Sequence, residues 1–239
     1  MLKPAQNYEI AFQEKNISDL KFNHHLKLQD VDFQYATSQD FILKDYSLSI
    51  KKGSVTGITG PSGSGKTTLM NILLGFIQPT KGKFFIDNEE LTVAHIEAYH
   101  KKVGYVQQQV YIIDATLLEN IAFGIEVDQI DTAKVEDVLK KASLWDLVSK
   151  LPQGINEMIG ENGSKLSGGQ RQRLGIARAL YVVAEILFFD EATSSLDDET
   201  EKEITESIKK LSDGRLTIII IAHRLTTLKY CDRIIKIGK

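Results

Sequence analysis

The chain has 239 residues, 42% of them hydrophobic, which is enough to bury a core as one large domain or two modest ones. Its net charge of −3 gives no electrostatic reason to expect a nucleic-acid partner, and its one cysteine, Cys231, excludes an internal disulfide. Because no apolar run approaches the roughly 20 residues of a membrane-spanning helix, we expect a soluble, cytosol-facing chain, which leaves open a membrane partner or a membrane segment on a longer polypeptide.

The first elements in chain order are a leader and two strands. Residues 1–25 are polar and weakly periodic, and we expect a loosely packed leader or linker there. Apolar residues then alternate with polar ones from Leu26 to Tyr35 and from Tyr46 to Ile50, which predicts antiparallel strands. The apolar run at residues 54–58 predicts the next strand.

A glycine-rich motif follows this strand and fits the pattern G-x-x-x-x-G-K-[ST]. It consists of Gly60, Pro61, Ser62, Gly63, Ser64, Gly65, Lys66 and Thr67, with Thr68 beside it. In such a loop backbone N–H groups turn onto phosphate oxygens, the lysine reaches the β- and γ-phosphates, and the hydroxyl of Thr67 binds Mg²⁺. A glycine-rich surface turn is the alternative, and the strand before and helix after disfavour it. The motif therefore predicts a nucleoside-triphosphate site.

The helix after the loop is predicted from apolar spacing. Leu69, Ile72, Leu73 and Phe76 follow the spacing i, i+3, i+4, i+7, so we expect all four on its buried face. The N-terminus of this helix, with its partial positive charge, would then point at the phosphates.

Later segments alternate between strand and helix patterns. We expect short strands near residues 84–88 and 103–106, then helices from about residue 116 to residue 184 that begin with a capping box at Thr116 and Glu119. Strands at 186–189, 217–222 and 233–237 and a helix with Ile204 and Ile208 buried complete the chain. This alternation implies a mostly parallel sheet with helices on both faces and an inserted helical subdomain.

Two adjacent carboxylates, Asp190 and Glu191, end the predicted strand at 186–189. Open α/β sheets bind ligands at this carboxyl edge. Asp190 can hold Mg²⁺, and Glu191 can orient and deprotonate an attacking water. Acidic residues also favour helix starts, which is the alternative interpretation. Together with the Lys66 loop, the pair favours catalysis.

A second glycine-rich helix start comprises Ser167, Gly168, Gly169 and Gln170. Ser167 and Gln170 form a capping box, and the two glycines leave backbone N–H groups uncovered. This pattern predicts a second anion-binding helix end, although spacing alone proves only a cap.

Leu166 to Gln170, taken with Lys66, Asp190–Glu191 and His223, resembles the nucleotide-binding domain of ABC transporters over essentially residues 26–239. The resemblance implies an α/β fold: a RecA-like P-loop NTPase core, an antiparallel β subdomain and an inserted helical subdomain at about residues 110–182. It implies ATP and Mg²⁺ as cofactors and two domains that sandwich two ATP molecules head to tail. Ser167 and Gly169 would then bind the γ-phosphate of ATP held by a second nucleotide-binding domain.

Further roles follow from the same resemblance. His223 looks like the switch histidine that contacts the γ-phosphate and Glu191. Asp197 matches the acid of a loop, with residues 194–196, that crosses the dimer interface, and helix capping is a compatible alternative. Tyr35 lies where an aromatic ring stacks on adenine, against the alternative of an ordinary strand tyrosine. Among three consecutive glutamines the family pattern selects Gln108, which would help to ligate Mg²⁺.

The apolar residues after this glutamine, 111–113, would form either a groove for a transmembrane partner or part of a small core. Residues 115–124 and 157–163 look exporter-like. We therefore expect residues 1–25 to be the tail of a fused transmembrane region, and the full-length protein to lie at the cytoplasmic face of the cell membrane. The family usually continues beyond residue 239, so we expect a C-terminally truncated domain with weakened stability or dimerisation. The alternative is a non-transport ABC ATPase of the DNA-repair, chromosome-maintenance or translation-factor type.

Overall fold

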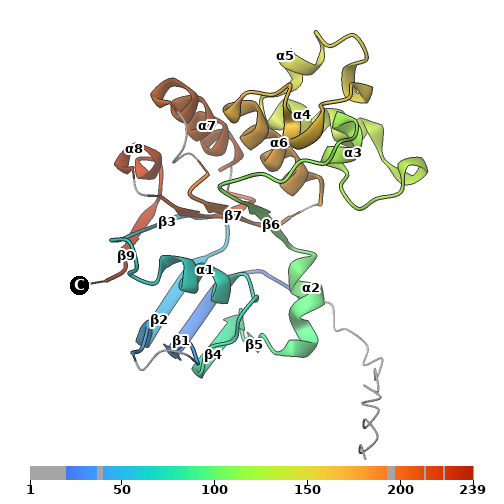
Figure 1. The fold of residues 1–239 in the computed structure, drawn as a ribbon. Coiled ribbons are helices and arrows are strands. Elements are labelled where there is room, and N and C mark those ends of the chain that lie inside the picture. Colours follow the sequence, from blue (N-terminus) through green and yellow to red (C-terminus); the bar gives the residue numbers. More distant parts are fainter. Residues whose placement is uncertain are drawn as a thin grey trace, which may run out of the picture.

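The structure, a computed structural model, describes residues 20–36, 40–182, 184–192, 197–212, 214–222 and 224–238. Within this part of the chain, five parallel strands form a central sheet in the order β6-β7-β8-β3-β9 (Figure 1). The strands are β3 (Val55–Thr59), β6 (Val103–Val106), β7 (Ile186–Asp190), β8 (Thr217–Ile221) and β9 (Arg233–Lys236). All residues of β8 are buried, as the unbroken apolar run of a strand covered on both faces predicts.

A second, antiparallel sheet lies below the first in Figure 1. Its order within the described residues is β2-β1-β4-β5. Its strands are β1 (His25–Phe33), β2 (Leu43–Lys51), β4 (Lys81–Ile86) and β5 (Glu89–Glu90). Leu28 pairs with Leu48 on one side and with Phe84 on the other, so β1 lies between its neighbours. The alternation read from residues 26–35 and 46–50 correctly predicted this sheet.

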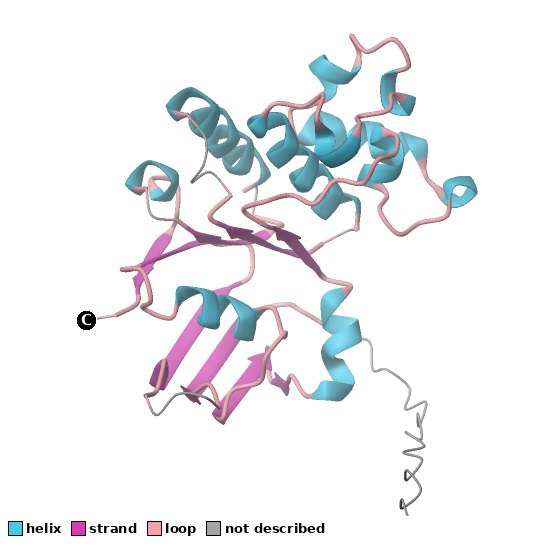
Figure 2. Cartoon of the chain, viewed as in Figure 1, coloured by secondary structure: helices cyan, strands magenta, loops and turns pink. Residues whose placement is uncertain are grey.

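Helices cover both faces of the parallel sheet (Figure 2). The α-helices are α1 (Lys66–Leu73), α2 (Ile96–His100), α3 (Leu117–Ile121), α4 (Thr132–Lys141), α5 (Trp145–Val148), α6 (Gly168–Tyr181), α7 (Asp198–Leu211) and α8 (Leu225–Leu228). Short 3₁₀ turns span Val93–His95, Val127–Gln129, Gly154–Asn156 and Glu161–Gly163. None of the helices in the described residues is long and apolar enough to cross a membrane.

Two apolar cores flank the parallel sheet. On one face Phe189 packs in a core with Leu174 of α6 and Ile204 of α7. On the other face Phe188 packs in a core with Leu69 of α1 and with the antiparallel sheet. The loop that precedes α1 and the N-terminus of α6 therefore belong to helices on opposite faces of one sheet.

The structure changes the prediction for the leader. Leu20 and Phe22 are only 1% and 2% exposed and belong to the core beneath α1. Asp87 fixes the same segment, because its carboxylate accepts hydrogen bonds from the backbone N–H groups of residues 23–25. Residues 20–25 are therefore packed against the domain, and residues 1–19 lie outside the described part of the chain.

The prediction for Phe76 was wrong. Helix α1 ends at Leu73, and Gly75 then takes a left-handed backbone conformation with φ +73°. The helical spacing therefore stops before Phe76, whose side chain is 56% exposed. Its ring lies edge-on to Tyr105, with 6.0 Å between ring centroids.

Candidate nucleotide-binding site

The glycine-rich loop connects the end of β3 to the start of α1, as predicted. Gly63 and Gly65 have φ of +74° and +95°, a conformation that glycine adopts without steric cost. A Cβ added at Gly63 would meet nothing within 4 Å, whereas one at Gly65 would lie 2.9 Å from Ile42 Cγ2. The loop is thus open on one side and packed tightly on the other.

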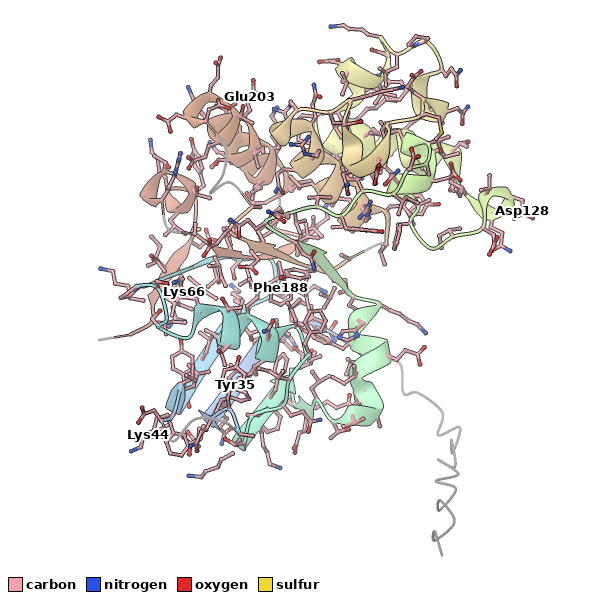
Figure 3. All side chains as sticks on the ribbon, viewed as in Figure 1. Tyr35, Lys44, Lys66, Asp128, Phe188 and Glu203 are labelled. Atoms are coloured by element: carbon pink, nitrogen blue, oxygen red, sulfur yellow. The ribbon has the colours of Figure 1, made fainter. Side chains whose placement is uncertain are left out.

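Lys66 is the first residue of α1, and Figure 3 marks it above Tyr35. Its ammonium group donates hydrogen bonds to the carbonyl oxygens of Gly60 at 3.0 Å and Pro61 at 2.8 Å, and the residue is 6% exposed. The buried Ser64 Oγ has no hydrogen-bond partner among the described residues. Because an unsatisfied buried hydroxyl costs about 1–3 kcal/mol, the loop suits a ligand rich in oxygen acceptors. The loop therefore fits a phosphate group.

Tyr35 follows β1 by two residues and is 43% exposed. Its hydroxyl lies 3.2 Å from the Thr68 hydroxyl, and its ring stands edge-on to Phe33 with 4.9 Å between centroids. These contacts hold an exposed aromatic ring beside α1, where a planar base can stack on it.

The two predicted carboxylates occupy the end of β7. Asp190 is partly buried and accepts a hydrogen bond from the Tyr105 hydroxyl. Burial raises the pKa of Asp190 and the charge of Glu191 adds to this, while the Tyr105 hydrogen bond and the charge of Lys66 oppose it. An exposed Thr67 hydroxyl and a carboxylate are the hard oxygen ligands that Mg²⁺ prefers, so the residues present fit this ion.

Glu191 has an unusual backbone for a residue other than glycine. Its φ is +48°, and its N–H donates to the Ile221 carbonyl oxygen at 3.0 Å. Such a conformation costs about 1–3 kcal/mol and is concentrated at functional sites. This backbone conformation interrupts the alternation of side chains along β7, so the Glu191 side chain does not have to point to the face opposite that of Asp190.

Gln108 and Asp190 line a common cavity. The cavity has a volume of about 520 Å³ and is lined by Tyr105, Gln107, Gln108, Gln109, Val110, Tyr111, Asn162 and Asp190. The carbonyl oxygen of Gln108 accepts a hydrogen bond from the amide of Gln172, a buried residue of α6 that the sequence reasoning missed. Gln172 lies two residues beyond the predicted capping box, and a polar residue on the buried side of a helix was the only signal available.

Residues 111–113, for which a partner groove and a small core were the two alternatives, do not share one environment. Tyr111 is 64% exposed, but Ile112 is 2% exposed and belongs to the helical core. The small-core alternative is therefore confirmed for Ile112, while Tyr111 is exposed and Ile113 is half-buried.

The second glycine-rich motif forms the predicted capping box at the start of α6. The Ser167 hydroxyl accepts from the N–H of Gln170 at 3.2 Å, and the Ser167 N–H donates to the Gln170 side chain at 2.8 Å. Gly168 begins the helix, and Gly169 is buried against α7. A Cβ on Gly169 would lie 2.3 Å from the methyl group of Thr200, so only glycine fits there without a shift.

Asp197 is the N-cap of α7, which confirms the capping interpretation. Its carboxylate accepts from the N–H and the hydroxyl of Thr200, at 3.0 and 2.8 Å. These hydrogen bonds lower the pKa of Asp197. Because Thr200 also contacts Gly169, the start of α6 and the start of α7 are packed together. Residues 194–196 and His223 lie outside the described residues.

A buried carboxylate that the sequence reasoning missed links α7 to the segment after β8. Glu201 is 3% exposed and accepts hydrogen bonds from Arg224, Thr226 and Thr227. Arg224 also donates to Asp198 at 2.9 Å. These hydrogen bonds therefore hold the first turns of α7, which follow Asp197, to the segment that begins α8.

A strand, a glycine-rich loop with a lysine, a helix, and a carboxylate pair at the end of a second parallel strand define a nucleoside-triphosphate-binding domain of the P-loop class. Comparison with known proteins narrows this class. Residues 43–194 match the family model described as ABC transporter. The chain therefore belongs to the ABC transporter family and contains its ATP-binding domain.

Individual relatives are longer than this chain. An ATP-dependent lipid A-core flippase from Ralstonia nicotianae is 43% identical over 218 residues, which cover 91% of this chain and 36% of the relative. A protein of the same name from Cupriavidus metallidurans is 42% identical, covering 88% of this chain and 35% of the relative. A solved bacterial Atm1-family ABC exporter with ATP bound is similar with a TM-score of 0.80 and 36% identity, covering 93% of this chain and 39% of that one. The chain thus spans about a third of its curated relatives.

Proposed function

We propose that this domain hydrolyses ATP and that the full-length protein uses the energy to export a substrate across a membrane. The observation that carries the ATPase function is the convergence of the Lys66 loop, which follows β3, and Asp190, which ends the parallel strand β7, at one edge of the sheet, with Gln108 lining the same cavity as Asp190. Export is supported by the names of the relatives, which are flippases and an exporter. The domain would then lie at the cytoplasmic face, beneath transmembrane domains.

The glycine-rich loop at residues 60–67 would bind the phosphates. Lys66 would move its ammonium group from the carbonyl oxygens of Gly60 and Pro61 to phosphate oxygens, which carry more negative charge. The backbone N–H groups of the loop and the Ser64 hydroxyl would bind further oxygens, and the exposed Tyr35 ring would stack on the adenine. When bound, Mg²⁺ would neutralise charge on the phosphates, and Thr67, Asp190 and Gln108 would hold it.

Glu191 is the proposed general base. It would orient a water in line with the γ-phosphate and accept its proton, a contribution of about 10²–10⁴-fold. His223 would contact the same γ-phosphate from the segment after β8. Phosphoryl transfer needs little covalent help, so placement of these groups would account for most of the rate enhancement.

The second half of each site would come from another nucleotide-binding domain. The Lys66 loop precedes a helix on one face of the sheet and Ser167 caps a helix on the other, which supports their use by different ATP molecules. Ser167, Gly168, Gly169 and Gln170 would bind the γ-phosphate held by the partner, and Asp197 would lie at the interface.

Replacement of Glu191 tests the ATPase mechanism. In Glu191→Gln the carboxylate that takes the proton is lost while the phosphate loop is intact. We expect ATP binding to be retained and turnover to fall by at least about 100-fold. The matched control is Glu203→Gln, because Glu203 is a half-exposed residue of α7 that pairs with Arg173 away from the loop. Unchanged turnover in Glu191→Gln would contradict the assignment.

A further inference from the structure

Tyr105 makes a direct contact with Asp190 that the proposed mechanism does not yet use. Its hydroxyl donates to Asp190 Oδ2 at 3.0 Å. The register of the sheet explains the contact: Tyr105 of β6 pairs with Phe188 of β7, two residues before Asp190. Because side chains alternate along a strand, Phe188 and Asp190 point to one face of the sheet, and Tyr105 points to the same face.

The tyrosine ring is itself fixed. It is partly buried between the strand and the exposed ring of Phe76, and it packs against the core that contains Leu69 of α1. Burial raises the pKa of Tyr105 well above its usual value, and the nearby charge of Asp190 adds to the shift.

The contact is not what joins the two strands. Strands β6 and β7 are already joined by a parallel ladder from Val103–Ile186 to Val106–Phe189. One further hydrogen bond across the same pair of strands is not needed to hold them together. Its effect is instead on the Asp190 side chain, whose rotation it restricts on the side of the sheet where α1 and the Lys66 loop lie.

Building on the ATPase function proposed above, we propose that Tyr105 is a positioning residue for Asp190. Its hydroxyl holds the carboxylate in the orientation that serves Mg²⁺·ATP. Groups that hydrogen-bond to metal ligands commonly change metal affinity by about 10–100-fold when they are removed. Tyr105 donates its hydrogen bond directly to the Asp190 carboxylate, so the loss of this bond should be felt at the metal and not at the nucleotide.

The test compares Tyr105→Phe with the full unsubstituted chain by calorimetric titration of ATP, once with Mg²⁺ in excess and once with EDTA. The variant keeps the ring and removes only the hydroxyl. We expect its affinity for ATP with Mg²⁺ to fall about 10-fold. In EDTA, where Asp190 has no ion to bind, its affinity for ATP should match that of the unsubstituted chain. The Mg²⁺ concentration at half-maximal binding should rise by the same factor.

Tyr99→Phe is the matched control. It also removes one hydroxyl hydrogen bond, from a fully buried tyrosine to the Leu73 carbonyl oxygen, but this bond does not involve Asp190. Thermal unfolding of both variants without ligand reports the structural cost of each deletion. The same Mg²⁺ dependence in Tyr105→Phe and Tyr99→Phe would overturn the positioning role, as would an equal loss of affinity in EDTA. A failure of the ATPase function itself would look different, because the unsubstituted chain would then bind no ATP in either condition.

Discussion

Replacing Glu201 by alanine should weaken the fold more than any surface change on the same helix. The Glu201 side chain is 4% exposed and lies between α7 and α8. Its Oε1 accepts from the hydroxyls of Thr226 at 2.6 Å and Thr227 at 2.7 Å, and its Oε2 accepts from Arg224. Alanine removes a charged acceptor from all three donors at once.

The magnitude follows from these contacts. A hydrogen bond to a charged group contributes about 1.5 kcal/mol or more, so the two threonine hydroxyls together account for about 3 kcal/mol. The ion pair with Arg224 is left out of this sum, because that arginine side chain is 40% exposed and water screens its charge. Against a typical domain stability of about 5–15 kcal/mol, a loss of about 3 kcal/mol is large.

Urea unfolding of Glu201→Ala and Glu203→Ala measures this difference. Glu203 lies on the same helix and pairs with Arg173, but its own side chain is 55% exposed, so its removal should cost less than the removal of the buried Glu201. Glu201→Gln should fall between the two, because its amide oxygen can still accept from the threonines. Equal stability losses in Glu201→Ala and Glu203→Ala, within about 0.5 kcal/mol, would refute the reasoning.

Two further outcomes follow from the same structure. Gly169→Ala places a Cβ 2.3 Å from the Thr200 methyl group, which should cost about 1–3 kcal/mol in urea unfolding; Thr200→Ser in the same chain removes that methyl, keeps the hydroxyl for Asp197, and should restore most of the loss. Burial opposes ionisation of Glu201, but hydrogen bonds from Thr226, Thr227 and Arg224 hold its pKa below the ordinary 4.5. The contribution of the Glu201 carboxylate to the free energy of unfolding is therefore complete above pH 4.5 and is lost as the pH falls through the folded-state pKa. The difference in stability between the unsubstituted chain and Glu201→Gln should then narrow on acidification. A difference that widens would contradict this sign.

Features set by neighbouring residues could be predicted from the sequence. The phosphate loop and the capping boxes at Thr116 and Ser167 depend on contacts within a few residues, and the structure contains all of them. Buried strands such as β7 and β8 were equally accessible, because continuous apolar runs between turns predict strands covered on both faces. Patterns among neighbouring residues were thus sufficient to predict the elements at the core of the fold.

Contacts between distant segments could not be predicted in this way. Tyr105 and Asp190 are 85 positions apart and Gln172 and Gln108 are 64 apart, and each pair meets only because of sheet register or helix packing. The error at Phe76 has a local cause: apolar residues continue at helical spacing in the sequence, but the left-handed Gly75 ends the helix before Phe76. Residues whose proposed roles depend on such long-range contacts could therefore be identified only from the structure.

The central proposal is that the ATP site is completed by a second nucleotide-binding domain, and mixing two inactive variants tests it. Lys66→Ala loses the phosphate-loop cation, and Ser167→Arg blocks the start of α6. In a head-to-tail pair of these variants, one site combines an intact loop from one copy with an intact Ser167 from the other. We predict little ATPase activity from either variant alone and a clear recovery when they are mixed. No recovery at any mixing ratio, or full activity of Ser167→Arg alone, would contradict a shared site.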